Sequence, residues 1–393
     1  MNSKHCIVLY CLFSFSCTNT ISVKNEKQGK LTASHYLALG EEKKILLDYD
    51  TAPNPPYMQM LEDESGKRIL TFLNPYMNAI YFFDYEKGIQ IGKTAYEKQG
   101  PNSILRMTSY YIHNMDSIYV YNMPMIEIAL TDSAGNVKSR ISLRDNRADW
   151  YNYLPQYLLS TSIPVIKIQD KLILTGLQTV AIPSESINEL YFAACVDIKT
   201  NEVEHIYTYP EELYGSNTNW EGDQATFVYP ELSPAGEMIH SFPMSHNIYV
   251  APWNSNDFKT RYAGSNNAST IHSINLDPKR TPNEVVLDRL VREDMYTAIL
   301  HDPYRHIYYR FMLQGISGAT ITTPLKSKPV VVIIMDENFN YLGETIIGTG
   351  EEWNWENSFV TPDGLMMEYI DLNVDSVEEY LILKTFTVEK INR

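Results

Sequence analysis

The sequence predicts an all-β protein, a six-bladed β-propeller of four-stranded antiparallel blades. Short apolar runs bounded by turn residues recur in groups of four along the 393 residues. The groups repeat roughly every 50 to 70 residues, which is typical of blades that need neighbours to bury their faces. One strand, Lys43–Asp48, also stands alone before the first group, while the last group has only three strands.

The hairpin at Lys328–Gly348 shows the repeated unit most clearly. Its run Val330–Ile334 is β-branched throughout, which suits a strand buried on both faces and is too short for an ordinary helix. An Asp–Glu–Asn turn leads into a second apolar run that ends at Gly348. This pattern predicts an antiparallel hairpin.

The other groups follow the same pattern, with Gly, Pro, Asn and Asp in the connections. In chain order the six groups span residues 57–95, 105–143, 164–209, 225–264, 295–348 and 357–388. Their second strands begin at Ile69, Ile118, Leu172, Met238, Ile307 and Leu365. A seven-bladed ring remains an alternative if the stretch Tyr262–Asp294 holds a further blade.

The two incomplete ends of the pattern complement each other. If Lys43–Asp48 pairs near Leu381, it supplies the fourth strand of the last blade, and the ring closes without an exposed edge. The sequence therefore predicts closure by an N-terminal strand.

One helix is expected in the long connection before the fifth group. Pro282 opens it, and Val286, Leu290 and Val291 fall at helical spacing within Asn283–Asp294. The helix is expected to rest on the ring, with contact to a partner protein as the alternative.

The first residues have the composition of an export signal. Lys4 precedes a short apolar stretch, Cys6–Phe15, that is too short to span a bilayer, and Ser16 stands directly before Cys17. We expect a signal at residues 1–17, a flexible tether at 18–30 and a single propeller domain at 31–393. Acylation of Cys17 would anchor the chain in a bacterial outer membrane, whereas plain cleavage would leave it periplasmic. A retained, buried first strand is a third interpretation.

Composition excludes several classes of function. The net charge is -16 and no run of Lys or Arg offsets it, so nucleic-acid binding is not expected. Outside the leader the chain has one cysteine, Cys195, predicted as a buried strand residue, with a catalytic thiol as the alternative. No cysteine pair, zinc motif or phosphate loop is present, so we expect no metal and no cofactor.

Aromatic residues gather in connections that should share one face of the ring. In a propeller, the blade-to-blade connections and the loops between second and third strands emerge together over the central channel. Aromatic rings beside carboxylates and amides suit a flat polar ligand such as a sugar or peptide. Packing of long loops on the ring is the alternative role. The predicted ligand-binding residues are Trp150, Tyr151, Tyr153, Trp220, Trp353, Trp355, Tyr76 and His246.

Candidates for acid–base chemistry are few. Glu351 and Glu352 beside the tryptophans, and Asp50 in an earlier connection, are the carboxylates that could act as acid or base.

The leader around Ser14–Cys17 and the six four-stranded groups together resemble a family of propeller lipoproteins of Bacteroidetes. These are six-bladed, TolB-like or NHL-like domains of unknown function, and the resemblance extends from Leu31 to Val388. It implies an envelope location and a binding or sensing role.

Three functions follow as hypotheses. The first is a monomeric, non-enzymatic binding module for a glycan, peptide or partner protein. The second is a hydrolase or lyase acting on carbohydrate or peptide, and the third is a membrane-tethered scaffold.

Overall fold

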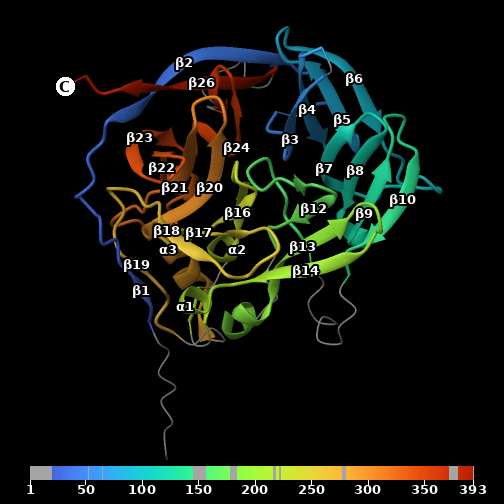
Figure 1. The fold of residues 1–393 in the computed structure, drawn as a ribbon. Helices are drawn as coiled ribbons and strands as arrows, with labels where there is room; N and C mark the ends of the chain where they lie inside the picture. The colour runs from blue at the N-terminus through green and yellow to red at the C-terminus, as the bar shows by residue number, and fades with distance from the viewer. Residues whose placement is uncertain are drawn as a thin grey trace, which may run out of the picture.

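Six four-stranded antiparallel sheets stand around a common axis (Figure 1). The computed structural model describes residues 20–51, 53–63, 65–144, 156–177, 184–215, 218–220, 223–276, 280–370 and 379–392. Each sheet packs apolar side chains against both neighbours, as blades of a propeller do. The predicted six-bladed fold is confirmed.

The strands of the first three blades run from the channel outward in chain order. Blade 1 contains β3 (Met58–Glu62), β4 (Arg68–Asn74), β5 (Ala79–Asp84) and β6 (Ile89–Ala95). Blade 2 contains β7 (Met107–Asn114), β8 (Ser117–Asn122), β9 (Glu127–Thr131) and β10 (Val137–Ser142). Blade 3 contains β11 (Ile166–Ile168), β12 (Lys171–Leu174), β13 (Tyr191–Asp197) and β14 (Val203–Thr208).

The other three blades complete the ring. Blade 4 contains β15 (Tyr229–Leu232), β16 (Glu237–Ser241), β17 (Asn247–Pro252) and β18 (Lys259–Tyr262). Blade 5 contains β20 (Met295–Asp302), β21 (Ile307–Leu313), β22 (Pro329–Asp336) and β23 (Tyr341–Thr349). Blade 6 contains β24 (Trp353–Thr361), β25 (Gly364–Tyr369), β26 (Tyr380–Lys390) and, on the outside, β2 (His35–Leu46).

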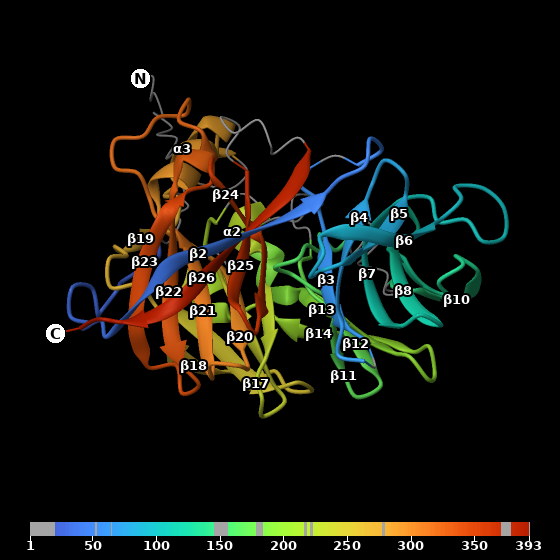
Figure 2. The ribbon, with the colours of Figure 1, turned by 90° about the horizontal axis from the view of Figure 1, so that it is seen from above.

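The ring closes through its two ends, as predicted. β2 pairs antiparallel with β26, so that Lys43 lies opposite Leu383 and Ile45 opposite Leu381. Both views show these two long strands side by side (Figures 1 and 2). Ile45, Leu381 and Leu383 belong to a buried apolar cluster that they share with blade 1.

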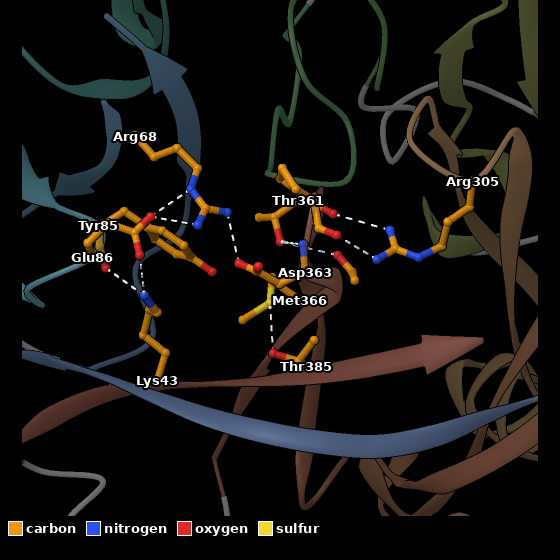
Figure 3. Close-up of polar contacts among 11 residues, drawn as sticks. Lys43, Arg68, Tyr85, Glu86, Arg305, Thr361, Asp363, Met366 and Thr385 are labelled. Atoms are coloured by element: carbon orange, nitrogen blue, oxygen red, sulfur yellow. Dashed lines mark hydrogen bonds and ion pairs between the residues drawn. The ribbon is translucent and has the colours of Figure 1, made fainter. Parts of the chain in front are cut away.

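Charged side chains join blade 6 to both of its neighbours (Figure 3). Arg68 of blade 1 lies 2.8 Å from Asp363 in the turn between β24 and β25 of blade 6. From blade 5, Arg305 donates to the carbonyl of Pro362 in that turn at 2.7 Å. Because exposed ion pairs contribute only roughly 0–1 kcal/mol each, these contacts set the alignment of the blades more than their stability.

The segment that begins at Thr20 is fastened to the ring. β1 (Ser22–Val23) pairs with β19 (Ile271–His272), and the side-chain amide of Asn25 donates to the carbonyls of Ser265 and Ala268 at 2.8 Å each. The prediction of a flexible tether is therefore wrong for residues 20–30. Its polar composition suggested a solvated chain, but these polar groups pair with backbone that the ring leaves free.

The predicted helix is present as α3 (Asn283–Arg292), and it rests on the ring through Val286, Leu290 and Val291. Lys328 donates to the carbonyls of Leu290 and Glu293 at 2.8 and 2.6 Å, which satisfies the end of the helix. The described residues of the stretch 262–294 contain β19 and α3 rather than a further four-stranded sheet, so the count is six blades and not seven.

The remaining helices are short. α1 (Glu211–Tyr214) and α2 (Asp223–Thr226) precede blade 4. The sequence predicted a strand from Ala225, but α2 covers Ala225 and Thr226 and the strand β15 begins only at Tyr229. Among the described residues the 3₁₀ helices are η1 (Met123–Met125), η3 (Ser184–Glu189) and η5 (Leu325–Ser327). Within the described parts of the chain, no helix is long and apolar enough to cross a membrane.

A buried cation fixes the junction of blades 4 and 5. Arg310 of β21 is fully buried and lies over the ring of Tyr296, 4.0 Å from its centroid. Its guanidinium donates to Ser241 Oγ at 3.0 Å and to the carbonyl of Ser245 at 2.9 Å. Burial lowers the pKa of Arg310 to about 10. Its hydrogen-bond partners are backbone carbonyls and a hydroxyl, so this cation holds the β16–β17 loop by hydrogen bonds while its guanidinium packs on Tyr296.

Candidate functional site

A cavity of about 400 Å³ opens where blades 4, 5 and 6 meet the central channel. Its walls come from connections that emerge on one face of the ring and from the starts of β15, β20 and β24. The lining residues are Asn54, Gln224, Phe227, Tyr229, Met295, Leu313, Leu325, Lys326, Lys328, Gly350, Trp353, Asn354, Trp355, Glu356 and Ile370.

An irregularity in β24 shapes one wall of the cavity. Asn354 pairs with Glu368, but the next pair is Ser358 with Met367, so three residues of β24 have no partner on β25. Such a bulge breaks the alternation of side chains and re-aims them. As a result four consecutive residues, from Trp353 to Glu356, line the cavity.

The two tryptophans of this wall differ in role. Trp355 is partly exposed and meets the ring of Tyr229 edge to face, with centroids 6.0 Å apart. Trp353 is buried between Tyr369 and Phe386, with centroids 5.1 and 5.0 Å away. Trp355 therefore presents a ring to the cavity, while Trp353 supports the wall behind it.

Charged groups of both signs line the same cavity. The side chain of Glu356 is exposed to the cavity, and the surrounding walls raise the pKa of its carboxyl, with Lys326 opposing that shift. Lys328 is buried, and burial lowers the pKa of its amine to about 7. The amine of Lys328 is bonded to the end of α3, so a ligand in this cavity would meet the carboxyl of Glu356 and the amine of Lys326 beside aromatic rings.

A second carboxyl lies directly behind the bulge. Glu368 is buried and accepts hydrogen bonds from the amides of Asn354 at 2.7 Å and Asn357 at 2.6 Å. Asn357 also donates to the carbonyl of Pro55 at 2.7 Å and accepts from Thr161 at 2.7 Å. Burial raises the pKa of Glu368 to about 7 despite these donors. This network ties the bulge to the connections that precede blades 1 and 3.

Glu368 should make stability depend on pH. Its pKa rises from 4.5 to about 7 on folding, so between these values the folded chain holds a proton that the unfolded chain has released. The free energy of unfolding should then fall by about 3 kcal/mol as pH rises through this window, at about 1.4 kcal/mol per pH unit. In Glu368→Gln this contribution should vanish, which denaturation at pH 4.5 and 8 would measure. Equal pH dependence in both proteins would contradict the assignment.

The structure separates the aromatic residues predicted to bind ligand. Trp353 and Trp355 line the cavity, although they lie on β24 and not in a connection as predicted. Tyr76 is 72% exposed in the β4–β5 loop, away from the cavity lining. Trp150, Tyr151 and Tyr153 lie outside the described residues.

Two of the predicted ligand-binding residues are packing residues. Trp220 is 1% exposed, donates from its indole nitrogen to the carbonyl of Leu213 at 2.6 Å and lies under Arg289. His246 is 3% exposed and its nitrogens lie 2.8 Å from Tyr296 Oη and 3.1 Å from the carbonyl of Val23. Both side chains hold loops on the ring, and neither of them lines the cavity.

The predicted carboxylates are likewise outside the cavity lining. Glu351 accepts from the hydroxyl of Ser327 at 2.6 Å, and Glu352 accepts from the backbone of Thr349 at 3.1 Å. Asp50 lies in the connection between β2 and β3. Glu356 lines the cavity instead, and Glu368 lies buried behind the bulge. Glu368 could have been suspected from its place inside an apolar strand, where a lone carboxyl is costly without partners.

Neither metal nor thiol chemistry gains support. Among the residues with described positions, no group of three His, Cys, Asp or Glu side chains could hold a metal ion. Cys195 is buried in β13, as predicted, and burial raises the pKa of its thiol to about 11.

Comparison with known proteins gives a family and a fold. The sequence profile of a family described as a domain of unknown function, DUF4221, matches residues 36–346. A crystal structure of a DUF4221 member from Bacteroides vulgatus is similar with a TM-score of 0.73 and 18% identity, over 92% of this chain and 100% of that one. A candidate exported protein from Bacteroides fragilis is similar with a TM-score of 0.54 and 10% identity, over 93% and 98%. No curated protein matches in sequence.

Proposed function

We propose that this chain, which belongs to the DUF4221 family, is an exported, non-enzymatic binding protein for a small glycan or peptide. The family membership and the six-bladed fold agree with the resemblance to propeller domains of unknown function, while lipidation belongs to the proposal. The observation that carries the proposal is the bulge of β24, which turns Trp355 and Glu356 into one cavity.

The cavity supports a flat polar ligand on three counts. Its volume of about 400 Å³ lies in the range of ligand sites, roughly 300 to 1,000 Å³. The ring of Trp355 offers a stacking face, and Gln224, Asn54 and Glu356 provide hydrogen-bonding groups nearby. The network of Glu368 holds the bulge in place, so the site is formed before a ligand arrives.

An envelope location is part of the proposal. The leader at residues 1–17 reads as an export signal, and the similar protein from Bacteroides fragilis is a candidate exported protein. Acylation of Cys17 would anchor the chain in the outer membrane, as the sequence around Ser14–Cys17 suggests.

Replacing Trp355 with alanine should weaken ligand binding about tenfold or more, because tenfold corresponds to 1.4 kcal/mol of lost stacking and contact. Screening the soluble fragment from Thr20 onward against glycan and peptide arrays would find the ligand, and calorimetry would compare the variants. Tyr304→Ala, an exposed aromatic in the turn after β20, is the matched control. Unchanged affinity in Trp355→Ala would remove the proposed site.

A hydrolase or lyase is the second candidate. Glu356 and Glu368 both have raised pKa values beside the cavity, which is the property of a general acid. Turnover of the bound ligand that is lost in Glu356→Gln with binding retained would establish catalysis. If the bound ligand is recovered unchanged after long incubation, the enzyme candidate is rejected and the binding proposal stands.

A further inference from the structure

The ring begins very close to the proposed anchor. The backbone N–H of Ile21 donates to Ser273 Oγ at 2.8 Å, and the N–H of Ser273 donates to the carbonyl of Ile21 at 2.9 Å. Only three residues separate Cys17 from Ile21. Four residue steps span at most about 14 Å even when fully extended. A lipid on Cys17 would therefore hold Ile21 within that distance of the bilayer surface.

Ile21 is fastened on the face that carries α3. Ser273 and Leu276 line one shallow groove together with Val285 and Arg289 of α3. The end of α3 is bonded to Lys328, which lines the candidate cavity. Figure 2 shows α3 at the upper end of the ring and strands β17 and β18 extending to the lower end. The anchor, α3 and the cavity thus share one end of the molecule.

Exposed aliphatic side chains lie on the same face. Leu287 of α3 is 50% exposed and Leu276 beside it is 42% exposed. Ile321 is 53% exposed, in a loop that Arg292 of α3 holds by donating to the carbonyl of Ala319 at 2.8 Å. Apolar side chains of this kind enter the interfacial region of a bilayer when a surface is held against it.

We propose that this face, formed by α3, Leu276 and Ile321, lies against the membrane surface, with the cavity on the same side. The proposal rests on the anchoring of Cys17 proposed above. A short anchor segment of this kind would hold the ring in one orientation on the membrane, whereas a flexible tether at residues 18–30 would leave its orientation free.

Fluorescence quenching would test the orientation. The acylated full-length protein is reconstituted in phosphatidylcholine vesicles that carry a quencher on the lipid headgroup. A fluorophore is attached at Leu287→Cys or, as the matched control, at Tyr304→Cys in the turn after β20. β20 runs from the end of the ring near α3 to the turn that holds Tyr304, and its seven residue steps separate Met295 from Asp302 by about 23 Å. Quenching at least threefold stronger at position 287 is expected, and equal quenching at both positions overturns the orientation.

Two further variants separate the orientation from the anchor. Cys17→Ser should abolish vesicle association; if the unaltered protein also stays off the vesicles, the anchor fails and the orientation fails with it. A twelve-residue Gly–Ser insertion before Ile21 should leave the protein bound but reduce quenching at position 287 by half or more. Bound protein with equal quenching at positions 287 and 304 overturns the orientation while leaving the anchor intact.

Discussion

Replacing Arg310 with leucine should lower the free energy of unfolding by about 4 kcal/mol, because a buried polar network left without its donor loses far more than one ordinary hydrogen bond. Leucine fills part of the volume but removes the guanidinium donors from the carbonyls of the β16–β17 loop. Chemical denaturation followed by tryptophan fluorescence would measure the change. The acceptors left without Arg310 are Ser241, Phe242, Ser245, His246, Asn247 and Ala263.

Arg261 provides the matched control for this substitution. It lies exposed on β18 of blade 4, the blade that Arg310 contacts, and donates to the adjacent carbonyl of Thr260. Arg261→Leu should change the free energy of unfolding by less than about 0.5 kcal/mol. A similar loss in both variants would show that blade 4 is sensitive to any lost arginine and that the buried network has no special role.

Deleting residues 380–393 should abolish cooperative unfolding altogether. This removes β26, which lies between β25 and β2 and carries Leu381 and Leu383 of the cluster shared with blade 1. The ring would open, β25 would become an exposed edge, and β2 would lose its partner. Loss of the thermal transition, with aggregation measured by light scattering, is the expected result.

A single substitution tests the same seam more gently. Leu383→Asp places a charge in the buried cluster and should reproduce most of the loss, whereas Lys390→Asp, at the exposed end of the same strand, should stay within about 0.5 kcal/mol of the unaltered protein. A deletion variant that still melts cooperatively would mean that five blades with an open edge suffice.

The fold could be predicted because blades repeat and because strand patterns are local. The run at Val330–Ile334 and the unpaired Lys43–Asp48 were sufficient to predict the sheets and the closure of the ring. Residues 20–30 could not be predicted, since their order depends on Asn25 meeting carbonyls more than 200 residues away. Polar composition shows that a segment can remain in solvent, but it does not show whether the segment finds partners on the folded ring.

The site was only half predictable, for a related reason. The cluster of Trp353, Trp355 and glutamates marked the right stretch, but the bulge that aims Trp355 and Glu356 at the cavity depends on pairing with β25. Trp220 and His246 show the converse. Residue type predicts that a ring or imidazole will find contacts, and only the packed structure shows whether those contacts are with a ligand or with the protein's own loops.

The pairing of β2 with β26 also bears on how the chain is made. β2 precedes blades 1 to 5 in the chain and β26 follows them, so β2 is synthesised long before its antiparallel neighbour. Until β26 is made, the unpaired backbone of β2 could pair with other unfolded chains, so it has to be shielded during synthesis. Closure of the ring therefore has to wait until β26 has been made.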